Sequence, residues 1–429
     1  MSVYPPIAVL LAALALGAPI YLTLLASGVV YFVTNPSVGT FVVPQLISAG
    51  IMKNTLLAIP FFIMSGVCMN RSGITRRLMR FSEVLTGHLP GGLAHVNILL
   101  STLMGGLSGS NIADAAMEAK ILVPDMVKRG FSPAYSSVVT AASALITPII
   151  PPGIGMIMYA FIANVSVGKM FMAGMVPGLA MCLWEMIANH FISKRRGYRP
   201  LHGKRASARE IAGEGKNAIL AVIFPFVLIF GIRFGIFTPT EGGAVAVLYA
   251  LVIGGPIYRE MSWRGLGGAL VETVVASCNS LMIFACANVF AWFVTNEKIS
   301  DHVAAFILSA VSTPTAFLLL FMAVVLFLGM FLDGTTMMII LVPLLLPVAE
   351  NMGIDLIHFG IIYLLCSAIG NITPPVGLVM YTVCDITGVK IKDFTRECLP
   401  FYAVLIVNVV LMILVPATVT AIPNWIYGG

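Results

Sequence analysis

Long uncharged stretches and short charged segments alternate along the chain. No Asp, Glu, Lys or Arg occurs in residues 1–52, 84–113, 130–168, 273–296, 302–332, 356–384 and 398–429. A membrane-spanning helix needs about 20 apolar residues, so each stretch can hold one span and several can hold more. Transmembrane β-strands would instead form short segments of alternating polarity. We therefore predict an all-α polytopic membrane protein with on the order of ten crossings, in which residues 5–33 form the first helix.

The composition supports this prediction. Hydrophobic residues make up 59% of the chain and charged residues 10%, with a mean hydropathy of +1.00, whereas soluble domains carry roughly 25% charged residues. A soluble enzyme and a disordered chain are both excluded by so much apolar surface. The first charged residue is Lys53, so the N-terminus lacks the basic region of a signal peptide. The seven cysteines form no CxxC pair and are expected to be buried, reduced thiols.

Basic residues cluster between the hydrophobic stretches. Residues 194–216 hold eight of the 24 Lys and Arg residues, and loops of this kind remain in the cytoplasm. The arginines between residues 71 and 80 favour the same side. The net charge of +6 therefore reflects membrane orientation rather than nucleic-acid binding. Residues 74–87 place apolar side chains opposite arginines, which is typical of a helix lying along the membrane surface, although an ordinary loop helix would show the same pattern.

The chain also repeats itself. A shift of 223 positions aligns Gly106 with Gly329 and the pair Pro151–Pro152 with Pro374–Pro375. A shared double proline with flanking matches is much rarer than chance matches among apolar residues, so we infer a two-fold repeat. If the basic loop is cytoplasmic, equivalent turns lie on opposite faces, which defines the inverted-topology repeat of many secondary transporters. The predicted parts are a first repeat, a cytoplasmic loop and a second repeat, over residues 1–193, 194–216 and 217–429.

A small polar tip interrupts an apolar run in each repeat. The first tip is GGLSGSN at residues 105–111, and the second is GMFLDGTT at residues 329–336. Half-length helical sequence flanks each tip, which predicts re-entrant hairpins over residues 90–128 and 313–350. A turn at membrane depth is tolerated only where it lines a cavity within the protein.

A proline-rich break follows each hairpin. The breaks are TPIIPPG at residues 147–153 and GNITPPVG at residues 370–377, and consecutive prolines remove backbone donors from a helix. We predict helices over residues 131–165 and 357–388 that unwind near their middle. Their free carbonyl oxygens, with Ser, Thr and Asn oxygens, suit a hard cation such as Na⁺, and the facing helix N-termini suit an anion. Proline kinks with small-residue packing are the alternative interpretation.

Ionisable groups at membrane depth are candidates for function. Asp333 in the second tip is the first candidate for a cation ligand, with a helix N-cap as the alternative. Asp114 and Glu118 lie one helical turn apart after the first tip, and they are candidate ligands, proton carriers or polar contacts. Glu241 opens a helix, so capping competes with a functional role. Glu185 is expected near the end of a span.

The residues quoted above resemble a known family. The tip GLSGSNIADAAMEAK, the breaks ITPIIPPG and NITPPVG, the segment FTPTEGG and the segment GHLPGG are together similar to the large membrane subunit of TRAP (tripartite ATP-independent periplasmic) transporters of the DctM type. The resemblance covers essentially the whole chain and rests on the combination of motifs. It implies an elevator-type fold, Na⁺ as the coupling ion and a place in the bacterial inner membrane.

The resemblance also implies site residues. The first Na⁺ site would comprise Ser108, Gly109, Ser110, Asn111, Thr147, Pro148, Ile150 and Pro151. The second would comprise Gly329, Asp333, Gly334, Thr336, Asn371, Ile372 and Thr373. The organic acid would contact Ser110, Asn111, Pro152, Gly153, Thr335, Pro374 and Pro375.

The implied partners are a periplasmic substrate-binding protein and a small membrane subunit, expected as a separate chain. No ATPase is expected, and no phosphate-binding loop occurs in the sequence. The amino-acid sequence of the first tip favours sialic acid as the substrate. A C4-dicarboxylate or another sugar or keto acid remains an alternative substrate. Two other functions remain as alternatives: a passive carboxylate channel or uniporter without ion coupling, and a membrane enzyme. The six histidines show no HExxH pattern, which disfavours the enzyme.

Overall fold

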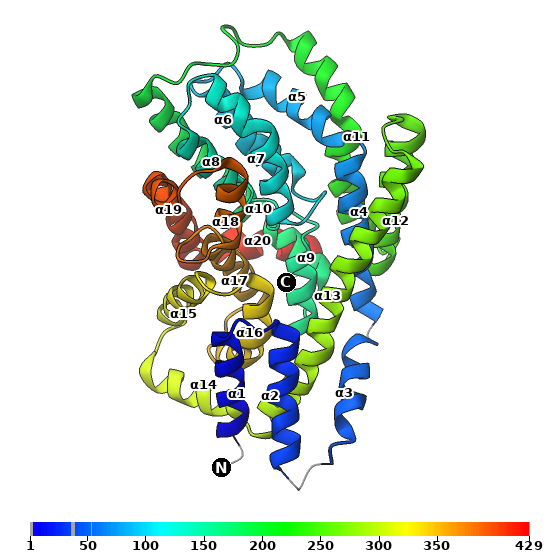
Figure 1. Cartoon of the computed structure of the whole chain (residues 1–429), viewed down its shortest axis with the longest axis vertical. Coiled ribbons are helices and arrows are strands. Elements are labelled where there is room, and N and C mark those ends of the chain that lie inside the picture. Colours follow the sequence, from blue (N-terminus) through cyan, green and yellow to red (C-terminus); the bar gives the residue numbers. More distant parts are fainter. Residues whose placement is uncertain (1–2, 36–38, 53, 429) are drawn as a thin grey trace.

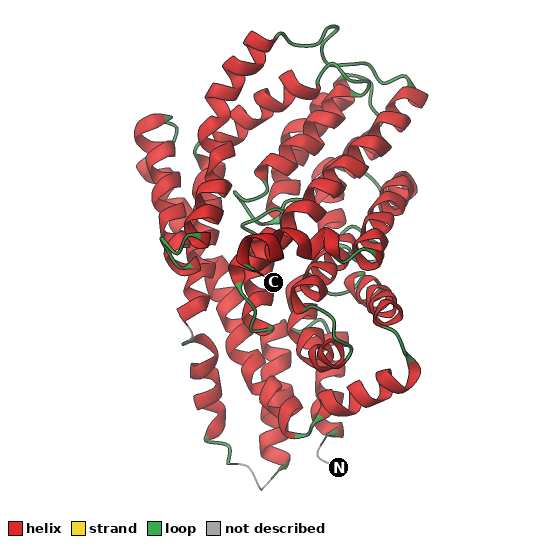
Figure 2. Ribbon diagram, turned by 180° about the vertical axis from the view of Figure 1, so that it is seen from behind, coloured by secondary structure: helices red, strands yellow, loops and turns green. Residues whose placement is uncertain are grey.

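The computed structural model describes residues 3–35, 39–52 and 54–428. All regular elements of these residues are helices, as predicted (Figure 2). Six helical segments in this part of the chain are long and apolar enough to cross a membrane by length and composition, and a seventh candidate is a helix pair bent by 117°. Many of the other apolar helices are only 10–17 residues long, because hairpin tips and proline breaks interrupt them.

The N-terminal region forms two helices, so the prediction of one helix over residues 5–33 is wrong. Helix α1 (Tyr4–Ala15) and helix α2 (Ile20–Thr34) lie side by side (Figure 1). Gly17 adopts a positive φ of 72° between them, a conformation that glycine tolerates best. The next residues of the turn are apolar, and hydropathy alone therefore could not reveal it.

A layer of long helices runs along one side of the molecule (Figure 1). It contains α3 (Val42–Ile51), η1 (Asn54–Leu57), α4 (Ala58–Arg71), α12 (Pro239–Val252), η2 (Ile253–Ile257) and α13 (Trp263–Asn296). Helix α4 packs closely on α12 and α13. A Cβ on Gly243 would lie 2.8 Å from Phe61 Cβ, which shows how small residues bring these helices together.

Helix α5 (Ile74–Thr86) is amphipathic, as its pattern indicated. The helix packs on α6 (Gly92–Met104) and α11 (Ala208–Arg233), and its residues Ile74 and Leu78 are buried. An ion pair connects α5 to the segment between η2 and α13, where Arg77 Nη1 lies 2.8 Å from Glu260 Oε1. Within the long layer, Arg71 Nη2 at the end of α4 lies 2.7 Å from Glu272 Oε2 of α13.

The same series of elements occurs in both halves. In the first half, α6 (Gly92–Met104) and α7 (Asn111–Lys128) form a hairpin, followed by α8 (Pro133–Ser143), α9 (Ile154–Ile162) and the long α10 (Val167–Arg196). In the second half, α14 (Ile299–Ala310) precedes the hairpin of α15 (Pro314–Gly329) and α16 (Gly334–Asn351), followed by α17 (Leu356–Gly370), α18 (Leu378–Thr387), α19 (Ile391–Leu414) and α20 (Ala417–Tyr427). The first hairpin lies in the upper half of Figure 1 and the second in the lower half.

The basic segment between the halves is more helical than expected. Helix α10 continues through Arg196, and α11 begins at Ala208, so only residues 197–207 connect them. Gly197 ends α10 with a positive φ of 70°. Ser207 and Glu210 form a reciprocal capping box that starts α11, and this arrangement satisfies backbone donors at the helix N-terminus.

Candidate transport site

The first hairpin tip is built on glycine. Gly106 and Gly109 have positive φ angles of 78° and 64°, which turn the chain within six residues between α6 and α7. Gly106 also lies against the first break, because a Cβ there would stand 2.3 Å from the carbonyl oxygen of Pro151. Ser110 is the N-cap of α7, and its hydroxyl accepts from the backbone N–H of Ala113 at 3.4 Å.

The second tip has an acidic cap in the aligned position. Asp333 Oδ1 accepts from the backbone N–H groups of Thr335 at 2.9 Å and Thr336 at 3.1 Å. The Thr336 hydroxyl donates to the other carboxylate oxygen. Asp333 therefore forms the N-cap of α16, the alternative considered for it, and at the same time lies at the surface of a cavity.

The second tip contacts the second break directly. The carbonyl oxygen of Met330 accepts from the backbone N–H groups of Val376 at 3.0 Å and Gly377 at 3.3 Å. A Cβ on Gly370 would stand 2.7 Å from the Cα of Gly329. The two glycines thus allow the backbones of tip and break to touch, which any larger side chain would prevent.

Both breaks expose backbone carbonyl groups. Residues 144–153 separate α8 from α9, and residues 371–377 separate α17 from α18. The double proline of each break contains a cis peptide bond. Among the described residues, the carbonyl oxygens of residues 147–152 and 373–376 accept no backbone hydrogen bond. These oxygens are therefore available to other partners, as the proline pattern predicted.

One cavity of about 240 Å³ lies where both tips and both breaks meet. Its lining includes the first residue of four helices: Asn111, Ile154, Gly334 and Leu378. Each helix N-terminus carries partial positive charge on its free N–H groups. No Lys, Arg or His is among the described residues that line the cavity. Its polarity thus comes from backbone dipoles, hydroxyl and amide groups, and the capping carboxylate of Asp333.

Eight of the predicted site residues line this cavity. They are Gly109, Ser110, Asn111, Pro148, Asp333, Gly334, Thr335 and Asn371. The amide oxygen of Asn371 is buried and has no hydrogen-bond partner in the described part of the chain. An unpaired buried acceptor is unfavourable unless a ligand or a water molecule satisfies it. Among the predicted residues in the lining, Asn371 therefore has an unpaired acceptor that is available to a ligand.

Other predicted site residues lie outside this lining. The Ser108 hydroxyl donates to Asp114, and the Thr147 hydroxyl donates to the carbonyl oxygen of Ser101 at 3.4 Å. Ile150 and Pro151 face a separate apolar cavity of about 190 Å³. The remaining residues belong to the tips and breaks but not to the cavity wall: Pro152, Gly153, Gly329, Thr336, Ile372, Thr373, Pro374 and Pro375.

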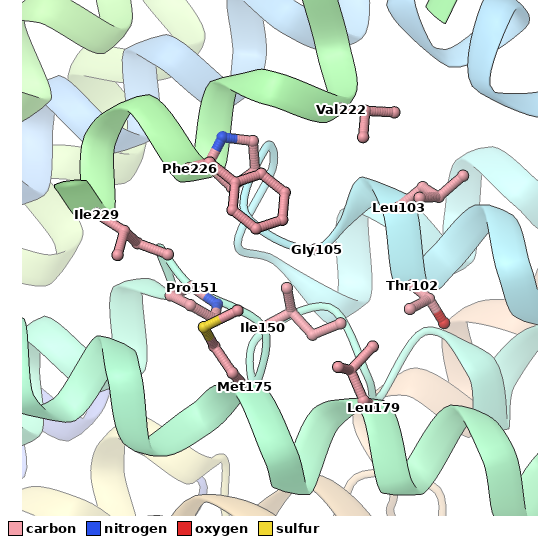
Figure 3. A pocket seen from close by; sticks show the side chains of 11 residues that line it. Thr102, Leu103, Gly105, Ile150, Pro151, Met175, Leu179, Val222, Phe226 and Ile229 are labelled. Carbon is pink, nitrogen blue, oxygen red and sulfur yellow. The ribbon is translucent and has the colours of Figure 1, made fainter. Parts of the chain in front are cut away.

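The apolar cavity lies between the first break and two long helices. Figure 3 shows Phe226 and Ile229 of α11 on one side and Met175 and Leu179 of α10 on the other, with Pro151 between them. A cavity with this lining offers few groups to recognise an organic acid. The polar cavity is the better candidate for the transport site.

The sequence did not predict ten of the residues that line the polar cavity, among which Ser367 has a polar side chain, and it did not predict Tyr363, which supports the lining. Ser367 lines the polar cavity, and the hydroxyl of Tyr363 donates to the carbonyl oxygen of Gly334. Both lie on the face of α17 that bears Asn371, at a spacing of four residues, which places them on neighbouring turns. That spacing is the signal in the sequence that could have identified them.

A buried polar network lies behind the first tip. Ser101 Oγ is within 2.8 and 2.9 Å of the two carboxyl oxygens of Glu118 and 3.0 Å from Ser143 Oγ. Asp114 and Glu118 are fully buried, and neither is among the residues that line the polar cavity. Glu185 is fully buried in the middle of α10, so its expected place near a span end is wrong.

Glu241 lies elsewhere and serves as a cap. Its carboxylate accepts from the backbone N–H of Thr238 at 2.7 Å and from the Thr238 hydroxyl at 2.9 Å. This capping box starts α12. The contacts of Glu241 are therefore those of a helix cap, which was the alternative to a functional role.

The fold and site define a class of protein: a helical membrane transporter subunit with two hairpins and two broken helices around a central cavity. Residues 7–418 match the model of a family described as tripartite ATP-independent periplasmic transporter, DctM component. The chain therefore belongs to the DctM family, the large membrane subunits of TRAP transporters. It is an inner-membrane transport subunit and not an enzyme.

Individual relatives agree with this assignment. The chain is 35% identical over 412 residues to the sialic acid TRAP transporter large permease protein of Vibrio cholerae, covering 96% of both chains. It is also 35% identical to the C4-dicarboxylate TRAP transporter large permease protein of Pseudomonas aeruginosa, covering 87% of both. The crystal structure of the Alcanivorax borkumensis YdaH transporter is similar over 86% of both chains with a TM-score of 0.62. At 14% identity, this last similarity concerns the fold alone.

Proposed function

We propose that this subunit imports an organic acid in symport with Na⁺, receiving the acid from a periplasmic binding protein. The observation that carries the proposal is the convergence of four helix N-termini on one cavity without a basic side chain in its described lining. Helix N-termini bind carboxylates through free N–H groups. Because these groups hold no full charge, an anion bound to them can be released again when its surroundings change.

Sodium would bind where the tips meet the breaks. The free carbonyl oxygens of residues 147–152 and 373–376, together with Ser110 and Asp333 at the helix caps, offer the oxygen ligands that hard cations prefer. A cation bound beside the cavity would also attract the negatively charged substrate. Ion and acid would then favour each other's binding, and this mutual effect is what symport requires.

The substrate is an organic acid, and sialic acid is the favoured member of that class. Relatives of equal identity to this chain are named for sialic acid and for C4-dicarboxylates, so overall similarity does not separate the two. The preference for sialic acid comes from the amino-acid sequence of the first tip. A cavity of about 240 Å³ accommodates a small acid, and a larger acid would require the hairpins to part.

Transport by an elevator movement fits the arrangement of the helices. The hairpins and broken helices pack around the cavity, while α4 packs mainly on α12 and α13 in the long layer. We propose that the hairpin-containing part moves against this layer, which a small membrane subunit would support from the side. Movement of a packed body carries the site across the membrane without an open pore, in contrast to a channel.

Uptake into proteoliposomes tests the function. The subunit is reconstituted with the small membrane subunit, the binding protein is added outside, and radiolabelled acids are supplied with an inward Na⁺ gradient. We expect accumulation that disappears when an ionophore collapses the Na⁺ gradient. Uptake that is insensitive to the ionophore but continues to equilibrium would favour the passive channel or uniporter, and counterflow of labelled substrate would then separate these two.

Substitutions at the two caps test the ion sites. We expect Asp333→Asn and Ser110→Ala to weaken Na⁺-dependent uptake by about tenfold or more, which corresponds to the loss of about 1.4 kcal/mol of cation binding. Glu214→Gln on the exposed first part of α11 serves as the control. Unchanged Na⁺ dependence in both cap variants would refute the placement of the ions.

A further inference from the structure

Glu118 of α7 is a carboxyl group without a compensating charge. Its side chain is fully buried, and the only hydrogen bonds that it makes with described residues involve Ser101 Oγ, at 2.8 and 2.9 Å. None of the ion pairs among the described residues includes it. An ionised carboxylate in such a place is strongly unfavourable unless a cation accompanies it.

The surroundings of Glu118 add negative charge. Asp114 lies one turn earlier on α7, and Glu185 lies on α10, which packs on α6. Glu185 is itself fully buried, and neither of its carboxyl oxygens has a hydrogen-bond partner in the described part of the chain. The amide oxygen of Asn97, which is on the same face of α6 as Ser101, is also buried without a partner. The buried oxygen acceptors of this region therefore outnumber the hydrogen-bond donors that could satisfy them.

A cavity leads to Glu118 from the side of the basic loops. It has a volume of about 520 Å³ and is lined by Glu118 together with Arg71, Arg76 and Glu260, and by apolar residues of α6 and α7. The positive-inside rule places these arginines at the cytoplasmic face. The polar cavity between the tips does not include Glu118 in its lining. Glu118 thus adjoins a cavity other than the transport site, while its own side chain is fully buried.

We propose that Glu118 binds a proton that it exchanges with the cytoplasm through this arginine-lined cavity. In the forward step, a hydronium ion in the cavity transfers H⁺ to a carboxylate oxygen when local motion exposes it, which leaves a water molecule and a neutral carboxylic acid next to Ser101. The acid can then donate a hydrogen bond and reduces the repulsion among the three carboxyl groups. In the reverse step, a buried negative charge returns and destabilises the packing of the first hairpin.

A proton fits the surroundings of Glu118 better than a metal ion. Hard divalent metal ions in proteins take six or more oxygen ligands, whereas α6 and α7 contribute only apolar residues to the cavity lining besides Glu118: Leu100, Met117, Ile121 and Leu122. The polar lining residues Asn70, Arg71, Thr75, Arg76 and Glu260 come from α4, α5 and the segment before α13. The elements packed against α7 are α6, α8 and α18, and their ionisable groups include His95 of α6, Tyr135 of α8 and the exposed Asp385 of α18. With Asp114, Arg71, Arg76 and Glu260, they complete the charges that surround the site.

Infrared spectroscopy of the purified subunit tests the proton directly. We expect the wild type at neutral pH to show the carbonyl stretch of a protonated carboxylic acid, and we expect Glu118→Gln to lose that component. Glu214→Gln, an exposed residue of α11, is the matched control and should leave it unchanged. A spectrum in which Glu118→Gln removes no acid component would overturn the proposal. Loss of the wild-type component on adding Na⁺ at constant pH would also overturn it, because the ligand would then be the metal ion.

The pH inside the vesicle tests the direction of exchange. Binding protein added outside selects the molecules whose periplasmic face points outward, so the vesicle interior corresponds to the cytoplasm. We expect wild-type uptake to fall by about tenfold per unit of internal pH once Glu118 has lost its proton, as a single titrating group requires. Glu118→Gln should remove this dependence on internal pH. Equal internal pH profiles in the two proteins would refute exchange with the cytoplasm.

The transport arm of this test rests on the proposed function, and the infrared arm does not. If no acid accumulates in any variant, the proposed function fails while the infrared spectra still decide whether Glu118 holds a proton. If Glu118→Gln abolishes uptake at every pH, the infrared spectra likewise decide whether Glu118 holds a proton.

Discussion

The first hairpin, α6–α7, and the second hairpin, α15–α16, share their tips but differ in their interiors. Each tip begins its second helix with a side-chain cap, Ser110 or Asp333, and each rests on a break with a double proline. Behind the tips, the first hairpin carries Ser101 and Glu118, whereas the second carries Val324 and Leu341 in the aligned positions.

The difference separates two requirements. Features found in both hairpins are the helix N-termini and the unwound backbone, and they form the common cavity. The polar network occurs in the first hairpin, away from that cavity. We infer that binding depends on backbone geometry present in both repeats, and that the acidic residues of the first repeat serve a separate purpose.

The largest effect is expected at the contact between the second tip and its break. Gly370→Ala would place a Cβ 2.7 Å from the Cα of Gly329, so the backbones must separate. Overpacking of this kind costs about 1–3 kcal/mol, and we expect uptake to fall by about tenfold or more, since each 1.4 kcal/mol is a factor of ten. The first repeat has Thr147 in the aligned position, so this requirement belongs to the second repeat. Gly213→Ala in α11, with nothing within 4 Å, is the control, and wild-type uptake in Gly370→Ala would contradict the contact.

A smaller effect should follow when the first hairpin is made like the second. Ser101→Val removes the hydroxyl beside Glu118 and should lower the free energy of unfolding by about 1–3 kcal/mol, because a buried polar group loses its partner. The double variant with Glu118→Leu should recover most of this loss, since both polar partners are then replaced. Denaturation of the purified protein in detergent measures both. Equal stability of the single and double variants would show that the two side chains do not depend on each other.

The smallest effect is expected when either helix cap is removed and the stability of the protein is measured without Na⁺. Asp333 accepts two backbone hydrogen bonds and Ser110 accepts one at 3.4 Å. Loss of a cap costs about 0.5–2 kcal/mol, so Asp333→Ala should lie near the upper end and Ser110→Ala near the lower. Thermal unfolding in Na⁺-free buffer measures the difference. A larger loss for Ser110→Ala would reverse the comparison between the tips.

Sequence reasoning was most informative where glycine, proline and charge mark the backbone. The tips and breaks were located because a double proline cannot continue a helix and because polar residues are rare in this chain. The turn between α1 and α2 was missed, since hydropathy remains high across Gly17 and Pro19. A turn inside a hydrophobic stretch leaves no trace in the charge pattern.

The candidate site was predicted in its parts but not in its assembly. Ser110, Asn111, Asp333 and Asn371 were identified, and they line one cavity. The sequence could not show that both tips meet in one place, because that depends on how the two repeats pack. It also could not show that Glu185 of α10 is fully buried without a hydrogen-bond partner among the described residues, since this depends on how distant helices pack.

Helix α13 relates the protein to the thickness of its membrane. Its 34 residues span about 51 Å at 1.5 Å per residue, compared with about 30 Å for the hydrocarbon core. The uncharged part, residues 273–296, spans about 36 Å and fits the core with some tilt. Residues 263–272 must then project beyond it. Glu272 is the last residue of this projecting segment before the uncharged part of α13, and it pairs with Arg71 at the end of α4. The position of α13 in the membrane therefore sets the depth at which α4 ends and α5 begins.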